Sequence, residues 1–132
     1  MKYISRNLEN VVNQVTKEYP VVLVTGPRQV GKTTMLQKLM EGTKRGYVTL
    51  DDLNERHIAK TDPELFLQLH KPPILIDEVQ YAPELFTYIK MHVDKYHEPG
   101  AFWLTGSQVF KLMRGIQESL AGRVAVLSLT SL

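Results

Sequence analysis

A glycine-rich segment in the first third of the chain has residue types that suit phosphate binding. It runs through Gly26, Pro27, Arg28, Gln29, Val30, Gly31, Lys32, Thr33 and Thr34. The spacing G-x-x-x-x-G-K-[ST] is typical of a loop whose backbone N–H groups cradle a chain of phosphates. Gly26 and Gly31 let the backbone curl around an anion, and a helix beginning near Lys32 would add the positive end of its dipole. We therefore expect this segment to bind a purine nucleoside triphosphate.

Three side chains of this segment have separate expected roles. Lys32 should reach the β and γ phosphates, which makes it a predicted catalytic residue as well as a binding residue. Thr33 offers a hydroxyl to Mg²⁺, and Thr34 offers a further hydroxyl near the α phosphate. The predicted ligands are therefore ATP and Mg²⁺.

Two adjacent carboxylates follow the apolar run 74–76. Asp77 is expected to hold Mg²⁺ through its water shell, and Glu78 to orient and deprotonate the water that attacks the γ phosphate. Acidic residues also follow strands as solvated starts of loops, but this alternative weakens beside a phosphate-binding segment. We predict Asp77 as a metal ligand and Glu78 as a catalytic residue.

Small hydroxyl residues and further carboxylates follow two other apolar runs. Ser107 is the predicted sensor of the γ phosphate, although Thr105 and Ser107 would equally suit the cap of a following helix. Asp51 and Asp52 follow the run 47–50. Either carboxylate could contact the water shell of the metal, or it could cap a helix.

Two arginines have both a catalytic and a structural interpretation. Arg123 precedes the last apolar run, and across a subunit interface it would neutralise charge in the transition state. The alternative is an ordinary structural ion pair, and Arg28 has the same two interpretations. The four histidines show no spacing typical of metal ligands, so they are expected to pack or to lie at the surface.

The elements that must position these residues are predicted from periodicity. Runs that are apolar at every position are typical of parallel strands buried on both faces, and amphipathic stretches alternate with them. The expected strands are 21–24, 47–50, 74–76, 101–104 and 124–129, and the expected helices are 4–15, 32–40, a stretch that includes a start at Asp62-Pro63-Glu64, one opening at Pro83, and 108–120. This alternation predicts a three-layer αβα sandwich around a mainly parallel five-stranded sheet.

Composition limits the class of protein. The 132 residues suit a single domain, 1–132, and 43% hydrophobic with 23% charged residues is ordinary for a globular chain. A net charge of +2 without a run of Lys and Arg gives no indication of nucleic-acid binding. The sequence has no cysteine, no signal-peptide core in residues 1–8 and no stretch long enough to span a membrane. The cytoplasm is the expected location, and no membrane partner is expected.

Taken together, the motifs resemble the AAA-type P-loop ATPase domain of a widespread prokaryotic family. They are Gly-Pro-Arg-Gln-Val-Gly-Lys-Thr-Thr (26–34), Leu-Asp-Asp (50–52), Ile-Asp-Glu-Val-Gln (76–80), Leu-Thr-Gly-Ser (104–107) and Glu-Ser-Leu-Ala-Gly-Arg-Val (118–124), and they cover nearly the whole chain. The resemblance implies a sheet with the strand order 2-3-4-1-5. It also implies a helical C-terminal domain of unknown function, which this sequence, ending at Leu132, does not include.

The first functional hypothesis is an ATPase that converts hydrolysis into a conformational change. The alternative is a nucleotide-gated binding module in which hydrolysis is slow or absent. A nucleotide or small-molecule kinase ranks last, because an adjacent Asp-Glu pair suits the activation of water and the candidate lid segments contain few arginines. No guanine-reading Asn-Lys-x-Asp tetrad is present, which favours ATP. The sequence leaves open whether the partner is a second copy of this chain or another protein.

Overall fold

The computed structural model describes residues 2–129, except for the side chains of residues 2–6 and of Gln29. The strands are β1 (Val21–Thr25), β2 (Gly46–Thr49), β3 (Ile74–Asp77), β4 (Phe102–Gly106) and β5 (Val124–Ser128). The helices are α1 (Lys2–Val15), α2 (Lys32–Leu39), α3 (Leu53–Thr61), α4 (Pro63–Leu69), α5 (Glu84–Tyr96) and α6 (Val109–Gly115). Three shorter turns complete the chain: the 3₁₀ turns η1 (Arg28–Val30) and η2 (Val79–Tyr81), and the π turn η3 (Ile116–Leu120).

The five strands form one parallel sheet in the order β2-β3-β4-β1-β5. This confirms both the predicted αβα class and the strand order that the resemblance implied. All residues of β1, β3 and β4 are buried, as the uninterrupted apolar runs predicted for strands covered on both faces. Because the strands are parallel, their carboxyl ends meet at one edge of the sheet, and the polar residues that follow them gather there.

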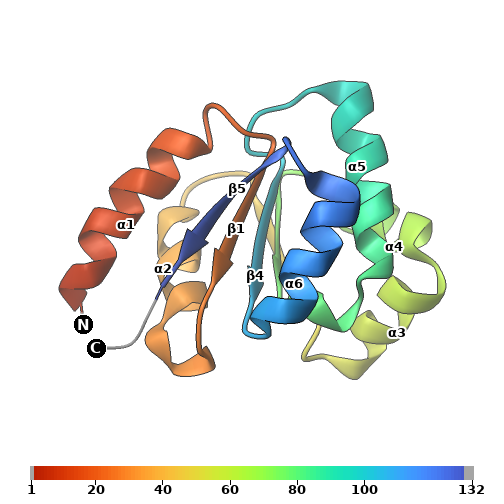
Figure 1. Cartoon of the computed structure of the whole chain (residues 1–132), viewed down its shortest axis with the longest axis horizontal. Coiled ribbons are helices and arrows are strands. Elements are labelled where there is room, and N and C mark those ends of the chain that lie inside the picture. Colours follow the sequence, from red (N-terminus) through yellow and green to blue (C-terminus); the bar gives the residue numbers. More distant parts are fainter. Residues whose placement is uncertain (1, 130–132) are drawn as a thin grey trace.

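Helices cover both faces of the sheet (Figure 1). On one face lie α1 and α2, whose Val12 and Leu36 pack with Trp103 of β4. On the other face, α3, α4, α5 and α6 form a larger core that contains Phe66 and Ile89. Trp103 is buried, as expected, and no helix within residues 2–129 is long and apolar enough to cross a membrane.

Two helical regions differ in detail from the prediction. In the first, the predicted helix start at Asp62-Pro63-Glu64 is confirmed, but the helical stretch before it is a separate helix: Asp62 ends α3 and then caps α4, accepting a hydrogen bond from the N–H of Leu65. The expected helix 108–120 is α6 followed by the π turn η3. At their junction a side chain on Gly115 would collide with the ring of Phe86, so glycine allows α6 to lie close to α5.

Candidate functional site

The glycine-rich segment connects the carboxyl end of β1 to the start of α2. Gly31 has a φ of 81°, a left-handed conformation that favours glycine, and it is the N-cap of α2. Gly26 has a φ of 154°, and a Cβ atom there would collide with the carbonyl oxygen of Leu129. Both glycines are therefore required by the backbone, and the amino end of α2 points to the space above the loop.

The remaining residues of the loop lie around this turn. Pro27 and Arg28 are exposed, Val30 is half-buried, and the side chain of Gln29 lies outside the described part of the structure. Thr34, in the first turn of α2, is exposed and can present its hydroxyl to a ligand.

Asp77 receives hydrogen bonds from three hydroxyls that come from different elements. Its Oδ1 accepts from Thr33 Oγ1 of α2 at 2.5 Å and from Thr105 Oγ1 of β4 at 2.7 Å. Its Oδ2 accepts from Thr49 Oγ1 of β2 at 2.8 Å. The carboxylate is buried, so these bonds fix its position at the edge of the sheet.

The oxygens of Thr33 and Asp77 suit a magnesium ion. Mg²⁺ in nucleotide sites is usually bound by one or two protein oxygens together with waters and substrate phosphates. The described residues contain no cluster of three or more acidic or histidine ligands, so a metal here would need phosphate oxygens and water to complete its shell. The donor set therefore fits Mg²⁺ delivered with a nucleotide.

Glu78 follows Asp77 in a left-handed conformation, with a φ of 57°. Its Oε1 accepts hydrogen bonds from Gln80 Nε2 at 2.8 Å and from Ser107 Oγ at 3.0 Å. Its backbone N–H donates to Thr105 Oγ1 at 3.0 Å. The unusual backbone turns the carboxylate back toward the loop, and only 4% of the side chain is exposed.

Lys32 lies beside Glu78 and is 1% exposed. Its Nζ donates to the carbonyl oxygen of Pro27 at 3.2 Å and lies 3.9 Å from Glu78 Oε2. Burial lowers the pKa of Lys32, and the charge of Glu78 opposes this shift. The structure thus brings together the predicted phosphate-binding lysine and the predicted base.

Arg28 is also brought to the site. Its guanidinium donates two hydrogen bonds of 3.1 Å to Asp51 and one of 2.7 Å to Tyr81 Oη, and it lies 3.8 Å from Glu78 Oε1. The hydrogen bond to Asp51 holds the pKa of Arg28 above its usual value. Asp52 instead caps α3, since its Oδ1 accepts from the N–H of Asn54. The two adjacent aspartates therefore have different roles.

Arg123 lies away from this cluster, next to the amino end of β5. Its guanidinium donates two hydrogen bonds to the Asp94 carboxylate of α5, at 2.7 and 3.0 Å. This contact lowers the pKa of Asp94. Within one chain the structure does not join Arg123 to the loop, and its role across an interface stays a prediction.

Sequence reasoning missed two residues of the site. Thr49 is aligned with Asp77 in the β2–β3 register, so knowledge of the strand pairing would have identified it. Gln80 is 2% exposed and holds Glu78 from two residues further along the chain. A glutamine two residues after a candidate base was the available sequence signal for Gln80.

The chain is similar in sequence to known proteins. The family described as an AAA domain matches residues 18–132. Two curated relatives, the uncharacterized proteins Mb2031c of Mycobacterium bovis and Rv2008c of Mycobacterium tuberculosis, are each 40% identical to this chain over 114 residues. The match covers 86% of this chain and 25% of each relative, so the chain spans about a quarter of their length.

Solved structures show the same fold. The Walker-type ATPase PABY2304 of Pyrococcus abyssi aligns with a TM-score of 0.63 at 18% identity, over 98% of this chain and 53% of that chain. The RuvB Holliday junction branch migration motor of Thermotoga maritima aligns with a TM-score of 0.55 at 18% identity, over 98% of this chain and 45% of that chain. At these identities the likeness concerns the fold alone.

Proposed function

The chain belongs to the AAA domain family, and from this membership and the geometry of its site we propose that it binds ATP with Mg²⁺ and hydrolyses it. The observation that carries the proposal is the convergence of Lys32, Asp77 and Glu78 at the edge of the sheet where β1 and β3 end, on either side of β4. A carboxylate with a purely structural role would not need the buried ammonium of Lys32 and a glycine-rich phosphate-binding loop beside it.

Each residue has a defined part in this proposal. The loop amides and Lys32 bind the β and γ phosphates, while Thr33 and Asp77 would hold Mg²⁺. The metal, when bound, neutralises charge on the phosphates. Because Oε1 of Glu78 is held by Gln80 and Ser107, Oε2 is the oxygen that accepts the proton of the attacking water. The water oxygen bonds to the γ phosphorus, the bond to the β-phosphate oxygen breaks, and ADP and phosphate result.

One observation favours the second candidate, a nucleotide-gated switch with slow hydrolysis. The side chain of Glu78 is 4% exposed and lies close to Lys32, so water reaches it only after the site rearranges. If that rearrangement needs a partner, the isolated chain would bind ATP and release little phosphate.

The proposal is tested by calorimetric titration with ATP and Mg²⁺, followed by phosphate release from the same sample. Glu78→Gln should bind ATP as the unchanged chain does and slow release by at least about 100-fold, because the base is lost. Lys32→Ala should abolish binding, and EDTA should stop release. Glu41→Gln, which removes an exposed carboxylate outside the site, is the matched control and should change neither quantity.

The outcomes separate the two candidates. Tight binding without release by the unchanged chain would favour the switch. Release that persists at full rate in Glu78→Gln would exclude Glu78 as the base. Far-ultraviolet circular dichroism of each variant confirms that lost binding does not come from lost folding.

A further inference from the structure

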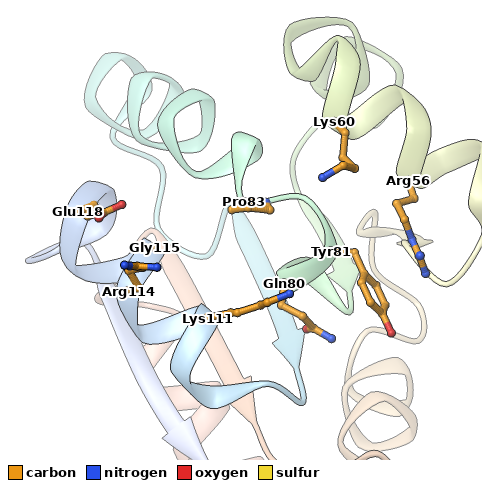
Figure 2. A pocket seen from close by; sticks show the side chains of 9 residues that line it. All are labelled: Arg56, Lys60, Gln80, Tyr81, Pro83, Lys111, Arg114, Gly115 and Glu118. Carbon is orange, nitrogen blue, oxygen red and sulfur yellow. The ribbon is translucent and has the colours of Figure 1, made fainter.

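A hollow with a volume of about 470 Å³ lies beside the proposed nucleotide site, between α3, η2 and α6 (Figure 2). Four of its lining residues are cationic: Arg56, Lys60, Lys111 and Arg114. Glu118 is the acidic residue of the lining. Figure 2 shows Lys60 and Lys111 extending from α3 and α6 toward the space between the two helices. The hollow therefore combines an excess of positive charge with a concave surface, which favours an anionic ligand.

Contacts within the chain engage two of these four cations and leave the other two without a carboxylate partner among the described residues. Lys60 Nζ lies 3.6 Å from Glu84 Oε2. Arg56 donates to the carbonyl oxygen of Leu50 at 2.8 Å, and its guanidinium stacks 3.8 Å from the centre of the Tyr81 ring. Within residues 2–129, no carboxylate lies within 4.0 Å of the charged nitrogens of Lys111 or Arg114.

The cationic surface continues around α6. A neighbouring hollow of about 520 Å³ is lined by Phe110, Lys111, Met113, Arg114 and Gln117. Lys111 and Arg114 line both hollows, so the two hollows adjoin along this helix. Phe110 is 93% exposed at the start of α6. A fully exposed aromatic ring beside two cations is the combination that binds single strands by stacking and charge.

We propose that this basic track, formed by Arg56, Lys60, Phe110, Lys111 and Arg114, binds single-stranded nucleic acid. Phosphates lie against Lys111 and Arg114, and a base stacks on Phe110. Two adjoining hollows suit a strand better than one small anion, and the exposed ring suits a base better than an acidic peptide. The cations come from α3 and α6, which are far apart in the sequence, so the site does not appear in the sequence as a run of Lys and Arg.

The inference does not rest on ATP hydrolysis, because strand binding is measured without nucleotide. Gln80 connects the two sites: it lines the basic hollow and donates to Glu78 Oε1. A bound strand would thus lie one side chain away from the proposed base.

The test is fluorescence anisotropy with a labelled twenty-nucleotide oligothymidine at several salt concentrations. Lys111→Gln with Arg114→Gln should weaken binding by at least about 10-fold and reduce the salt slope by about 1.4, which corresponds to two lost phosphate contacts on a single strand. Phe110→Ala should weaken binding by about 5-fold to 150-fold with little change in the slope. Lys17→Gln with Lys38→Gln removes the same charge from exposed sites elsewhere and should leave the affinity within about 2-fold.

Four results would overturn the proposal. They are no binding by the unchanged chain, an equal loss in both double variants, a Phe110→Ala protein that binds normally, and displacement of the oligonucleotide by polyglutamate of equal charge. The last result would reassign the track to an acidic protein partner. The substituted side chains are all exposed, and thermal unfolding of each variant confirms that the fold is intact.

Discussion

Lys32 carries a charge in the interior of the protein. Only 1% of the residue is exposed, and burial lowers its pKa despite the nearby carboxylate of Glu78. Because the folded-state pKa is below the ordinary value of 10.5, the unfolded chain binds more protons between the two values. The free energy of unfolding contributed by this group therefore rises as pH rises through that window. Below the window the charged lysine destabilises the fold.

Lys32→Met should consequently raise the unfolding temperature of the protein without nucleotide near pH 7. The difference from the unchanged chain should shrink as the pH approaches 10.5, because Lys32 then loses its proton in the folded state. Thermal unfolding followed by circular dichroism across this range measures both effects. Lys38→Met, an exposed position on the same helix, controls for the other groups that titrate. A lower unfolding temperature for Lys32→Met at pH 7 would contradict the argument.

At the scale of residues, the sequence was most informative where a motif is local. The loop 26–34 and the pair Asp77-Glu78 were predicted because their chemistry depends on neighbours along the chain. The sequence could not decide between roles for Asp51 and Asp52, which depend on where Arg28 and α3 lie. Ser107 was left between a sensor and a helix cap, and its hydroxyl is in fact directed to Glu78.

At the scale of elements, the close contact between α5 and α6 depends on Gly115, which has no side chain. Gly115→Ala should destabilise the protein by about 1–3 kcal/mol, because the new methyl group would collide with the ring of Phe86. The better helix propensity of alanine offsets part of this loss. Urea unfolding measures the difference. Gln117→Ala, an exposed neighbour, should stay within about 0.5 kcal/mol.

A double-mutant cycle identifies the cause of that loss. If the collision with Phe86 is responsible, the cost of Gly115→Ala should fall when Phe86→Leu is already present. An unchanged cost would assign the effect to the backbone of η3 instead.

The arrangement of elements was only partly predictable. The all-apolar runs of β1, β3 and β4 showed that these strands are parallel and buried, since few other structures accommodate them; β2 and β5, at the edges of the sheet, are only partly buried. The order of the strands depends on long-range pairing, and it came from the family resemblance instead of from periodicity. The basic track was missed for the same reason, because Lys60 and Lys111 line one hollow only after α3 and α6 pack on the same face of the sheet.

At the scale of the whole molecule, the position of Arg123 tests for assembly. If Arg123 acts on the site of a neighbouring copy, phosphate release per chain should rise with protein concentration, and Arg123→Ala should remove that rise. Asp94→Ala removes its bidentate partner within the chain and should preserve the rise. A flat concentration dependence in the unchanged chain would assign Arg123 to the ion pair with Asp94 alone.

The contact between Gly26 and Leu129 has a mechanical consequence. The N–H of Leu129 donates to the carbonyl oxygen of Thr25 at 2.8 Å, and its own carbonyl lies against Gly26. The backbone that leaves β5 is therefore hydrogen-bonded to the residue that precedes the phosphate loop and packs against the first residue of the loop. A force that pulls on the chain at Leu129 would stretch this hydrogen bond before it stretches the hydrogen bonds between β1 and β5 inside the sheet. A force on this segment would therefore act on the start of the phosphate loop first. Conversely, a change in the conformation of the loop would shift the backbone at Leu129.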